Sequence, residues 1–480
     1  MSHVLLLTLV VLYFLLLLGV AYYTSRHSNN QTFFIGNKSS HWALVAFGMI
    51  GTSLSGVTFI SVPGTVSAAG FGYFQVVLGY YIGYFIVAFV LLPLYYKLNL
   101  TSIYDYLNHR FGMTAYKTGA LFFILSRTLG ATLRLYLVIN VLQLFILDHI
   151  GIPFEVTSVI ILVMILLYTF KGGVKTIVWT DTLQTLFMLL ALVVCVVYIL
   201  SDLNLGVGAA LEAMSDKGYT QIFTWDLNDK RFFIKSIIGG AFVTVSMTGL
   251  DQEMMQKNIS VKKLGDSQKN MMTFSTVMVL VNFLFLFLGG LLYLYAGARG
   301  ITTSGDDLFP SIAVNLLPAS ISIIFIIGLI SALFPSADGA ITALTSSFCI
   351  DIIGLMRNQK LSEEQRSNRR KLVHLSFAVL FLAFIFLFKW IDNKSIISIL
   401  LDIAGYTYGP LLGLFAFGIL STRKVNSTWV PAVCLLAPAM CYLLQQMLMS
   451  NPGFYQIGIE MLVINGAATF AGLWAISKKG

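Results

Sequence analysis

Charged residues are scarce in this sequence. Asp, Glu, Lys and Arg together make up 11% of its 480 residues, whereas hydrophobic residues make up 57%, and the mean hydropathy is +0.84. Apolar runs of the ~20 residues that are needed to cross a bilayer recur from one end of the chain to the other. The longest polar stretches, about residues 202–231 and 354–371, have the length of loops. The composition therefore excludes a soluble globular protein and predicts an integral membrane protein.

The sequence also lacks the motifs of familiar enzymes and metal sites. It contains no HExxH, GxSxG or P-loop pattern, so we expect neither an enzyme nor a bound cofactor. The opening segment has no basic n-region and no convincing cleavage site, so we interpret it as a retained helix and not as a signal peptide. The cysteines lack metal-ligand spacing and fall within apolar segments, which predicts small core residues. They are Cys195, Cys349, Cys434 and Cys441.

Thirteen apolar segments are long enough to span a membrane, which predicts an all-α fold. The predicted spans are residues 4–25, 42–69, 71–96, 117–147, 152–170, 177–201, 232–256, 272–297, 319–350, 371–390, 395–421, 428–448 and 456–476. If the N-terminus lies outside, the inward loops hold 21 of the 30 basic residues, Lys257 among them. This bias predicts a multi-pass protein of the plasma (inner) membrane with an outer N-terminus and a cytoplasmic C-terminus. The net charge of +9 then needs no nucleic-acid partner, and we expect no obligate protein partner either.

The second span has an unusual composition. Its segment Gly48–Pro63, GMIGTSLSGVTFISVP, combines three glycines with five hydroxyl side chains and ends in proline. Interior glycines cost about 1 kcal/mol each against alanine, so the helix is loosened here. Released carbonyls and hydroxyls are hard oxygen ligands for a dehydrated Na⁺. The alternative is a close-packed helix whose small residues admit a neighbour.

The span pattern predicts an internal duplication. The seventh span, GGAFVTVSMTGLDQEMMQ, is also rich in glycine and hydroxyls, and each of these two spans is followed by four more. Five spans plus five, each half opening on a broken helix, is the layout of an inverted-repeat transporter. The predicted parts are a leading helix with an inner loop (1–41), a first five-helix repeat (42–201), an outer loop (202–231), a second five-helix repeat (232–421) and two trailing helices (422–480).

Several polar residues are predicted to lie at membrane depth, where charges indicate a pathway or a binding site by default. Asp181 and Asp338 are within spans, and Arg127 and Arg134 share one helical face because they are seven residues apart. The structural alternative is an Arg–Asp pair that neutralises two buried charges, or an Asp181 that caps or snorkels near the interface. Asp402 is either a near-surface acid or a group in the cavity. Aromatic residues such as Tyr80 are candidates for covering a ligand or for packing.

Five motifs resemble the sodium:solute symporter family. They are GTSLSGVTFISVP, FKGGVKTIVWTDTLQ, GLDQEMMQK, ALFPSADGAITALTSSFCIDII and GYTYGPLLGLF, and they extend from about residue 40 to 421 in the order and spacing of that family. The resemblance implies the five-plus-five inverted-repeat fold first described for a leucine transporter, with one leading and two trailing helices. It also implies Na⁺ as the coupling ion and a small-molecule solute as the cargo.

The resemblance implies a widely shared sodium site. It would use backbone oxygens of Gly51 and Leu54, the carbonyl of Ala332, and hydroxyls near Pro335 and Ser336. A position that is often serine in the family is Pro335 here, so one hydroxyl ligand is missing. Water or a carbonyl would then have to take its place.

A second sodium site, found in some members only, is implied at Ser55, Thr58, Asp181, Asp338 and Gly339. The first three match the pattern. Asp338 stands where some relatives have serine, which makes the site more acidic. Two carboxylates so close together could alternatively leave one of them protonated.

The resemblance gives two different clues to the solute. Arg134 matches an arginine that contacts the substrate carboxylate in sialic acid carriers, whereas Asp402 lies near the position of an amide in sugar carriers and could accept hydrogen bonds from sugar hydroxyls. Ser53 and Tyr80 complete the candidate substrate-binding set. The two clues favour different ligands.

The leading hypothesis is a sodium-coupled symporter that imports a small polar solute, a sugar or a sialic acid-like molecule, by alternating access. One alternative is a proton-coupled carrier of the same fold, with Asp181 or Asp338 as the proton carrier. Another is a membrane module that senses the solute without transporting it, which we consider weaker because we expect no cytoplasmic output domain.

Overall fold

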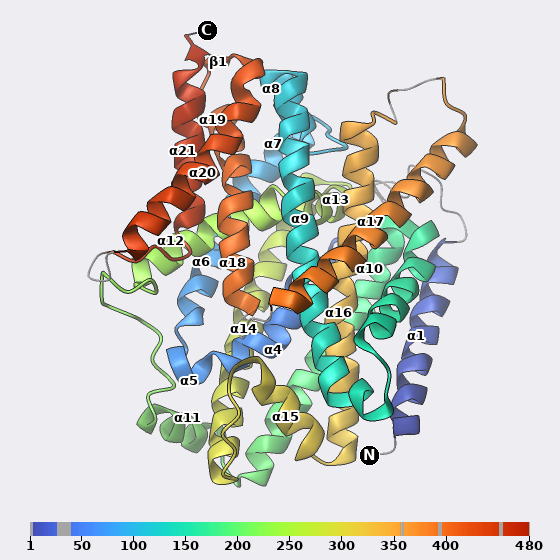
Figure 1. Ribbon diagram of the computed structural model, residues 1–480, viewed down its shortest axis with the longest axis vertical. Helices are drawn as coiled ribbons and strands as arrows, with labels where there is room; N and C mark the ends of the chain where they lie inside the picture. The colour runs from blue at the N-terminus through green and yellow to red at the C-terminus, as the bar shows by residue number, and fades with distance from the viewer. Residues whose placement is uncertain are drawn as a thin grey trace.

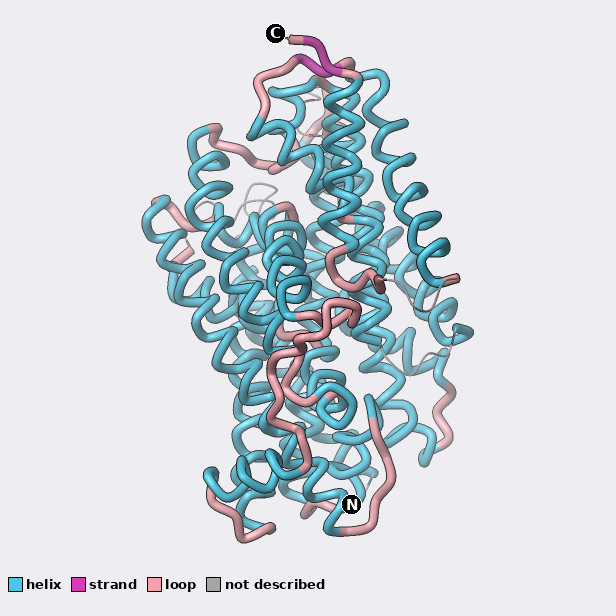
Figure 2. Tube along the Cα trace, turned by 90° about the vertical axis from the view of Figure 1, so that its left-hand side faces the viewer, coloured by secondary structure: helices cyan, strands magenta, loops and turns pink. Residues whose placement is uncertain are grey.

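The computed structural model describes residues 3–25, 40–355, 357, 360–391, 396–450 and 455–479. Within these residues the chain is mainly helical, as Figure 2 shows. The strands β1 (Lys424–Val425) and β2 (Ser477–Lys478) form a short antiparallel pair near the C-terminus. Most helices run along the long axis, with α1 starting at one end of the molecule and β1 at the other (Figure 1). The predicted helical architecture is confirmed, whereas the inner loop expected around residues 26–39 lies outside the described residues.

Short π and 3-10 helices carry the symbol η, and the remaining helices are α-helices. The first half of the chain forms α1 (His3–Ser25), α3 (Trp42–Ser53), α4 (Gly56–Gly64), α5 (Val66–Ala69), α6 (Tyr73–Ile86), η2 (Val87–Leu91), α7 (Leu92–Lys97), α8 (Asp105–Phe111), α9 (Met113–Leu142), η3 (Gln143–Leu147), η4 (Asp148–Ile150), α10 (Phe154–Asp202) and α11 (Val207–Asp216). The second half forms α12 (Phe233–Thr244), η5 (Val245–Gly249), α13 (Gln252–Ile259), α14 (Leu264–Ala298), η6 (Gly305–Asp307), α15 (Leu308–Asn315), α16 (Ala319–Ser347), η7 (Phe348–Ile352), α17 (Glu363–Ile391), α18 (Ile396–Thr407), α19 (Gly409–Leu420), η8 (Ser427–Trp429), α20 (Val430–Met449) and α21 (Met461–Ala475).

Among the described residues, seven helices are long and apolar enough to cross a membrane. Three further candidates are pairs of helices bent at a short break: α3 and α4 by 54°, α12–η5 and α13 by 65°, and α18 and α19 by 45°. Counting each pair as one span raises the number to ten. The broken second and seventh helices that the composition predicted are therefore present, and a third break near Tyr408 was not predicted.

α10 is a single helical run that covers two of the predicted spans, 152–170 and 177–201. η3, just before α10, contacts α15, which follows α14. Asp202, at the other end of α10, pairs with Arg299 directly after α14. Both ends of the run thus lie near the same end of α14. A straight helix of 49 residues would be about 74 Å long, so the run must reverse direction between the two predicted spans.

Glycines let the helices around the centre approach closely. A Cβ on Gly48 of α3 would stand 3.1 Å from the carbonyl oxygen of Val178 in α10, and a Cβ on Gly51 would overlap the hydroxyl of Thr185. α6 and α12 meet in the same way, because a Cβ on Gly240 would overlap the carbonyl of Val76. The second span therefore has both expected structural features: its small residues admit α10, and the helix breaks a few residues later. Its role as a source of Na⁺ ligands stays a prediction.

Candidate functional site

The break between α3 and α4 lies at the centre of the molecule. Leu54 has φ −80° and ψ 82°, Ser55 has φ −81° and ψ 176°, and neither continues the helix. The last carbonyls of α3 thus lack the N–H partners that an unbroken helix would supply. Gly56 opens α4 directly against Val138 of α9, and its Cβ position lies 4.0 Å from the carbonyl oxygen of Ala332. The break therefore faces both α9 and α16.

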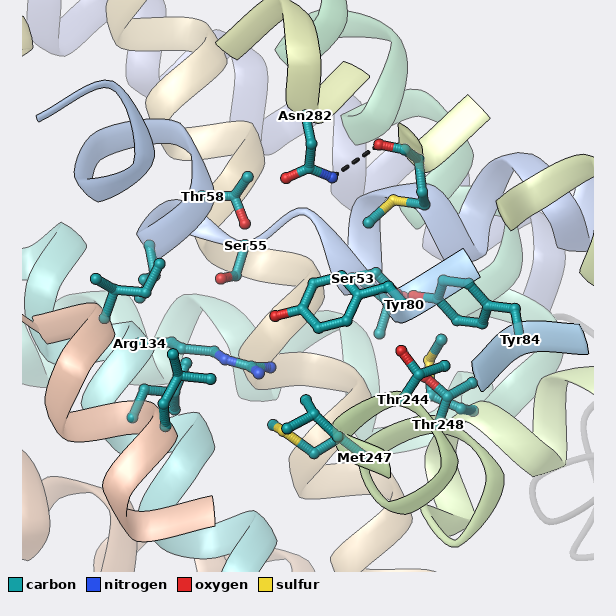
Figure 3. Close-up of a pocket in the computed structure, with 18 of the residues that line it drawn as sticks. Ser53, Ser55, Thr58, Tyr80, Tyr84, Arg134, Thr244, Met247, Thr248 and Asn282 are labelled. Carbon is teal, nitrogen blue, oxygen red and sulfur yellow. Dashed lines mark hydrogen bonds between the residues drawn. The ribbon is translucent and has the colours of Figure 1, made fainter. Parts of the chain in front are cut away.

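A pocket of about 90 Å³ opens beside this break. Its wall includes residues of α3, α4, α6, α9, α12, η5, α13, α14 and α18, and Figure 3 shows how the side chains face one another. The wall is rich in hydroxyl groups and also holds two guanidinium groups. The polar lining residues are Thr52, Ser53, Ser55, Thr58, Tyr73, Tyr80, Tyr84, Arg127, Arg134, Thr244, Thr248 and Asn282. This pattern suits a small polar solute.

Arg134 extends from α9 into the middle of the pocket, with its guanidinium facing the side of Tyr80 and Ser53 (Figure 3). It is 8% exposed, and its Nε has no hydrogen-bond partner among the described residues. No carboxylate in the described part of the chain forms an ion pair with it. A buried cation without a partner is costly, and a bound carboxylate would satisfy its planar fork of donors.

Arg127 is two turns away on the same helix and, unlike Arg134, lies within ion-pair distance of two carboxylates of the protein. Its Nη2 contacts Glu253 Oε2, and its Nε lies 3.7 Å from Asp251 Oδ2. Asp251 caps α13 by accepting from the N–H of Glu253 at 2.9 Å, and Tyr408 donates to it at 3.2 Å. The predicted alternative of an arginine that neutralises buried acids is thus correct for Arg127, although its partners come from the seventh span.

The residues of the implied shared sodium site come from the two elements that meet at the break. Gly51 and Leu54 are at the end of α3, and Ala332, Pro335 and Ser336 lie on α16, which contacts both α3 and α4. The hydroxyl of Ser336 donates to the carbonyl of Leu333 at 3.0 Å, so its lone pairs stay available. Pro335 cannot donate to the carbonyl of Ser331 one turn earlier, which releases a further oxygen in this segment.

The residues of the implied second site have different surroundings from one another. Ser55 and Thr58 face the central pocket. Asp181 Oδ2 accepts from Lys257 Nζ at 2.7 Å and from Thr52 at 3.0 Å, while its Oδ1 has no partner among the described residues. Asp338 accepts from the hydroxyl of Tyr168 at 2.8 Å.

Gly339 explains how α13 can approach α16 at this point. A Cβ on Gly339 would overlap the carboxylate of Glu253. Alanine at this position would thus force the Glu253 carboxylate to shift. The second sodium site as a whole stays a prediction.

Asp402 is separated from the other substrate candidates. Ser53, Tyr80 and Arg134 line the central pocket, whereas Asp402 lines a second, larger cavity of about 1160 Å³. Among its lining residues are members of the predicted outer loop, such as Asp229.

Three apolar or aromatic side chains lie between the two cavities. Tyr73, Ile397 and Leu401 line both of them. The hydroxyls of Tyr73 and Tyr80 are 3.1 Å apart, which links this layer to the pocket wall. One thin layer of side chains thus separates the central pocket from the larger cavity at the predicted outer loop.

Two buried charged residues next to the predicted site were not recognised from the sequence. Lys257 was assigned to an inward loop, but it is 2% exposed and paired with Asp181. The cause is the 65° bend at Asp251, which turns α13 back into the protein instead of letting it leave the membrane. Glu253 was passed over although it stands four residues before Lys257, the spacing of a helical ion pair. Asp251, two residues after Gly249, was a readable N-cap signal.

Comparisons with known proteins agree with this architecture. The profile of the sodium:solute symporter family matches residues 33–428. The sodium/sialic acid symporter of Proteus mirabilis (strain HI4320) is 25% identical over 423 residues, which cover 85% of this chain and 83% of that protein. The sodium/sialic acid symporter of Aliivibrio fischeri (strain ATCC 700601 / ES114) is 25% identical over 466 residues, covering 94% and 89%.

A solved structure shares the fold. It is the substrate-bound, outward-open state of a Na⁺-coupled sialic acid symporter, which matches with a TM-score of 0.83 at 21% identity and covers 99% of each chain. With the family profile extending over most of the sequence, the assignment does not depend on the pocket alone. The chain belongs to the sodium:solute symporter family.

Proposed function

We propose that this protein is a sodium-coupled symporter that imports a small carboxylate solute of the sialic acid type. The observation that carries the proposal is Arg134, whose guanidinium forms no ion pair among the described residues and faces a pocket whose polar wall is rich in hydroxyls. A guanidinium fork binds a carboxylate through two parallel hydrogen bonds. Sugar hydroxyls would meet Ser53 and Tyr80 in the same pocket. The relatives named for sialic acid favour the same class of solute.

The location of Asp402 supports the carboxylate clue over the sugar clue. A carboxylate next to Arg134 would have indicated a neutral sugar, because the arginine would already be neutralised. Asp402 instead lies in the outer cavity. We therefore place Arg134, Ser53 and Tyr80 in the binding site and Asp402 on the entry route.

The coupling Na⁺ is assigned to the break in the second span. The carbonyls of Gly51, Leu54 and Ala332 and the hydroxyl of Ser336 are hard oxygen donors, which suit a hard cation. Pro335 supplies no hydroxyl, so water completes this shell. The same break carries Ser53 and Ser55 into the solute pocket. Ordering of the break by Na⁺ would therefore strengthen solute binding, and the solute would strengthen Na⁺ binding by the same factor.

The two cavities support an outward-facing state. The outer cavity is lined by the predicted outer loop, and the pocket below it is smaller than the roughly 300–1,000 Å³ of typical ligand sites. Tyr73, Ile397 and Leu401 would therefore move to admit a sugar acid. Closure of this layer over the bound solute, followed by opening of the opposite side, is alternating access.

The topology and domain boundaries remain part of this proposal. Ten spans, with each bent pair counted once, and three shorter apolar helices support a count of thirteen. We retain the outer N-terminus, the five-plus-five repeat over residues 42–201 and 232–421, and the two trailing helices. The basic residues of the predicted inner loops support this orientation after Lys257 is removed from the count.

A thermal-shift screen tests the proposed function. The purified protein should be stabilised by N-acetylneuraminic acid only in the presence of Na⁺, and not when choline replaces Na⁺, because a ligand raises the melting temperature only if it binds the folded state. Its neutral precursor sugar N-acetylmannosamine, which lacks the carboxylate, is the matched control. Equal stabilisation by both sugars would contradict the assignment of Arg134.

A further inference from the structure

A buried lysine lies at the junction of α3, α10 and α13. Lys257 is 2% exposed, and its ammonium group has three N–H donors. Three oxygen atoms accept them: Thr52 Oγ1 at 2.6 Å, Asp181 Oδ2 at 2.7 Å and Glu253 Oε1 at 3.2 Å. Every donor of this ammonium is therefore used within the protein.

The three acceptors come from three different helices and surround the ammonium group. Thr52 is on α3, Asp181 is on α10, and Glu253 shares α13 with the lysine. The hydroxyl of Thr52 also donates to Asp181 Oδ2 at 3.0 Å, so hydroxyl, carboxylate and ammonium close a triangle. A charge removed from water in this way is stable only when it is paired and hydrogen-bonded. The arrangement is the one that a bound cation would require.

The charge balance shows what this ammonium does. Arg127 contacts Glu253 and lies near Asp251, and it makes no contact with Asp181. Lys257 is the only cationic group within ion-pair distance of Asp181 among the described residues. Without Lys257, the buried Asp181 carboxylate would face no positive charge from the described part of the chain.

We propose that the ammonium group of Lys257 occupies the position beside Asp181 that a second Na⁺ would otherwise take. The carrier would then bind one Na⁺ instead of two. This inference rests on the proposed sodium coupling and specifies its stoichiometry. Thr52 lies between Gly51 and Leu54, the residues assigned to the coupling Na⁺. The bond from Lys257 to Thr52 therefore places this cation next to the end of α3, beside the proposed site of the coupling Na⁺.

Binding of ²²Na⁺ to the purified protein tests the inference without any solute. The wild type should bind about one Na⁺ per protein, and Lys257→Met should bind about two, because the unpaired Asp181 carboxylate then attracts a cation from solution. Lys262→Met is the matched control, since it makes the same change at an exposed lysine five residues along. It should bind about one Na⁺.

A double variant keeps the test decisive if Lys257→Met does not fold. Lys257→Met combined with Asp181→Asn removes both charges and should again bind about one Na⁺. Binding of about two Na⁺ by the wild type or by the double variant, or equal binding by Lys257→Met and the control, would overturn the inference. A wild type that binds no Na⁺ at all would instead contradict the proposed function, so the two failures are distinguishable.

Discussion

Two arginines on one helix show how local partners decide a residue's role. Arg127 and Arg134 are two turns apart on α9 and both reach the central pocket. Arg127 is held by Glu253 and Asp251, whereas Arg134 has no such pair among the described residues. Their shared face could be predicted from the spacing. Their different partners could not, because the acids come from the second half of the chain and depend on the bend at Asp251.

Replacement of Arg134 by lysine should weaken binding of a carboxylate sugar by about 1–3 kcal/mol, since lysine keeps the charge but loses the two-pronged geometry. Binding of the neutral sugar should change much less. Isothermal titration in saturating Na⁺ measures both affinities. An equal loss for the two ligands would mean that Arg134 is structural.

Arg127→Gln should act on stability. The change leaves Glu253 buried with one cationic partner fewer, and breaking a buried ion pair in this way costs about 3–5 kcal/mol. Arg231→Gln is the matched control, because Arg231 pairs with Asp229 at the surface, where such a pair contributes about 0–1 kcal/mol. Melting temperatures in detergent compare the two variants. Similar melting temperatures would show that the buried network contributes little.

At the scale of the helices, composition predicted two of the three breaks. Glycines and hydroxyls in the second and seventh spans indicated loosened helices, and both are bent there. The direction of the second bend could not be predicted, because it depends on the contact between Glu253 of α13 and Gly339 of α16. Because this bend buries Lys257, its assignment to an inward loop, which was based on charge alone, is wrong. The third break, at Tyr408, is followed directly by Gly409 and Pro410, a helix-breaking signal that the prediction did not use.

The contact between α6 and α12 offers a test at the same scale. Gly240→Ala places a methyl group against the backbone carbonyl of Val76, which cannot move aside as a side chain would. We expect a loss of about 1–3 kcal/mol, the usual cost of overpacking. Gly265→Ala is the control, since nothing lies within 4 Å of its Cβ position in α14. Alanine there should be neutral or stabilising by up to about 1 kcal/mol. If Gly240→Ala and Gly265→Ala have the same melting temperature, the two helices can separate freely.

At the scale of the whole molecule, the sequence predicted the helical class, most spans and several side chains of the pocket wall, such as Ser53, Tyr80 and Arg134. Single spans are readable because each must satisfy its own backbone and present an apolar surface. The pairing of Asp181 with Lys257 was not readable, because the two residues lie on α10 and α13 and meet only after these helices have packed. Long-range ion pairs of this kind leave no periodic signal in the chain.

The orientation of the molecule can be tested with a membrane-impermeant maleimide. A cysteine at Ser362, in the exposed loop before α17, should be unreachable from outside intact cells, whereas a cysteine at exposed Gly218 should react. The native cysteines are buried and give a low background. Labelling of Ser362 but not Gly218 would reverse the proposed topology.

Sodium-driven uptake tests the central claim most directly. The protein is reconstituted into vesicles with equal pH on both sides, and uptake of radiolabelled N-acetylneuraminic acid is followed with an inward Na⁺ gradient or with choline in its place. We expect the Na⁺ gradient alone to concentrate the solute inside, and monensin, which collapses that gradient, to release it. Accumulation that persists in choline and follows an imposed proton gradient would contradict sodium coupling.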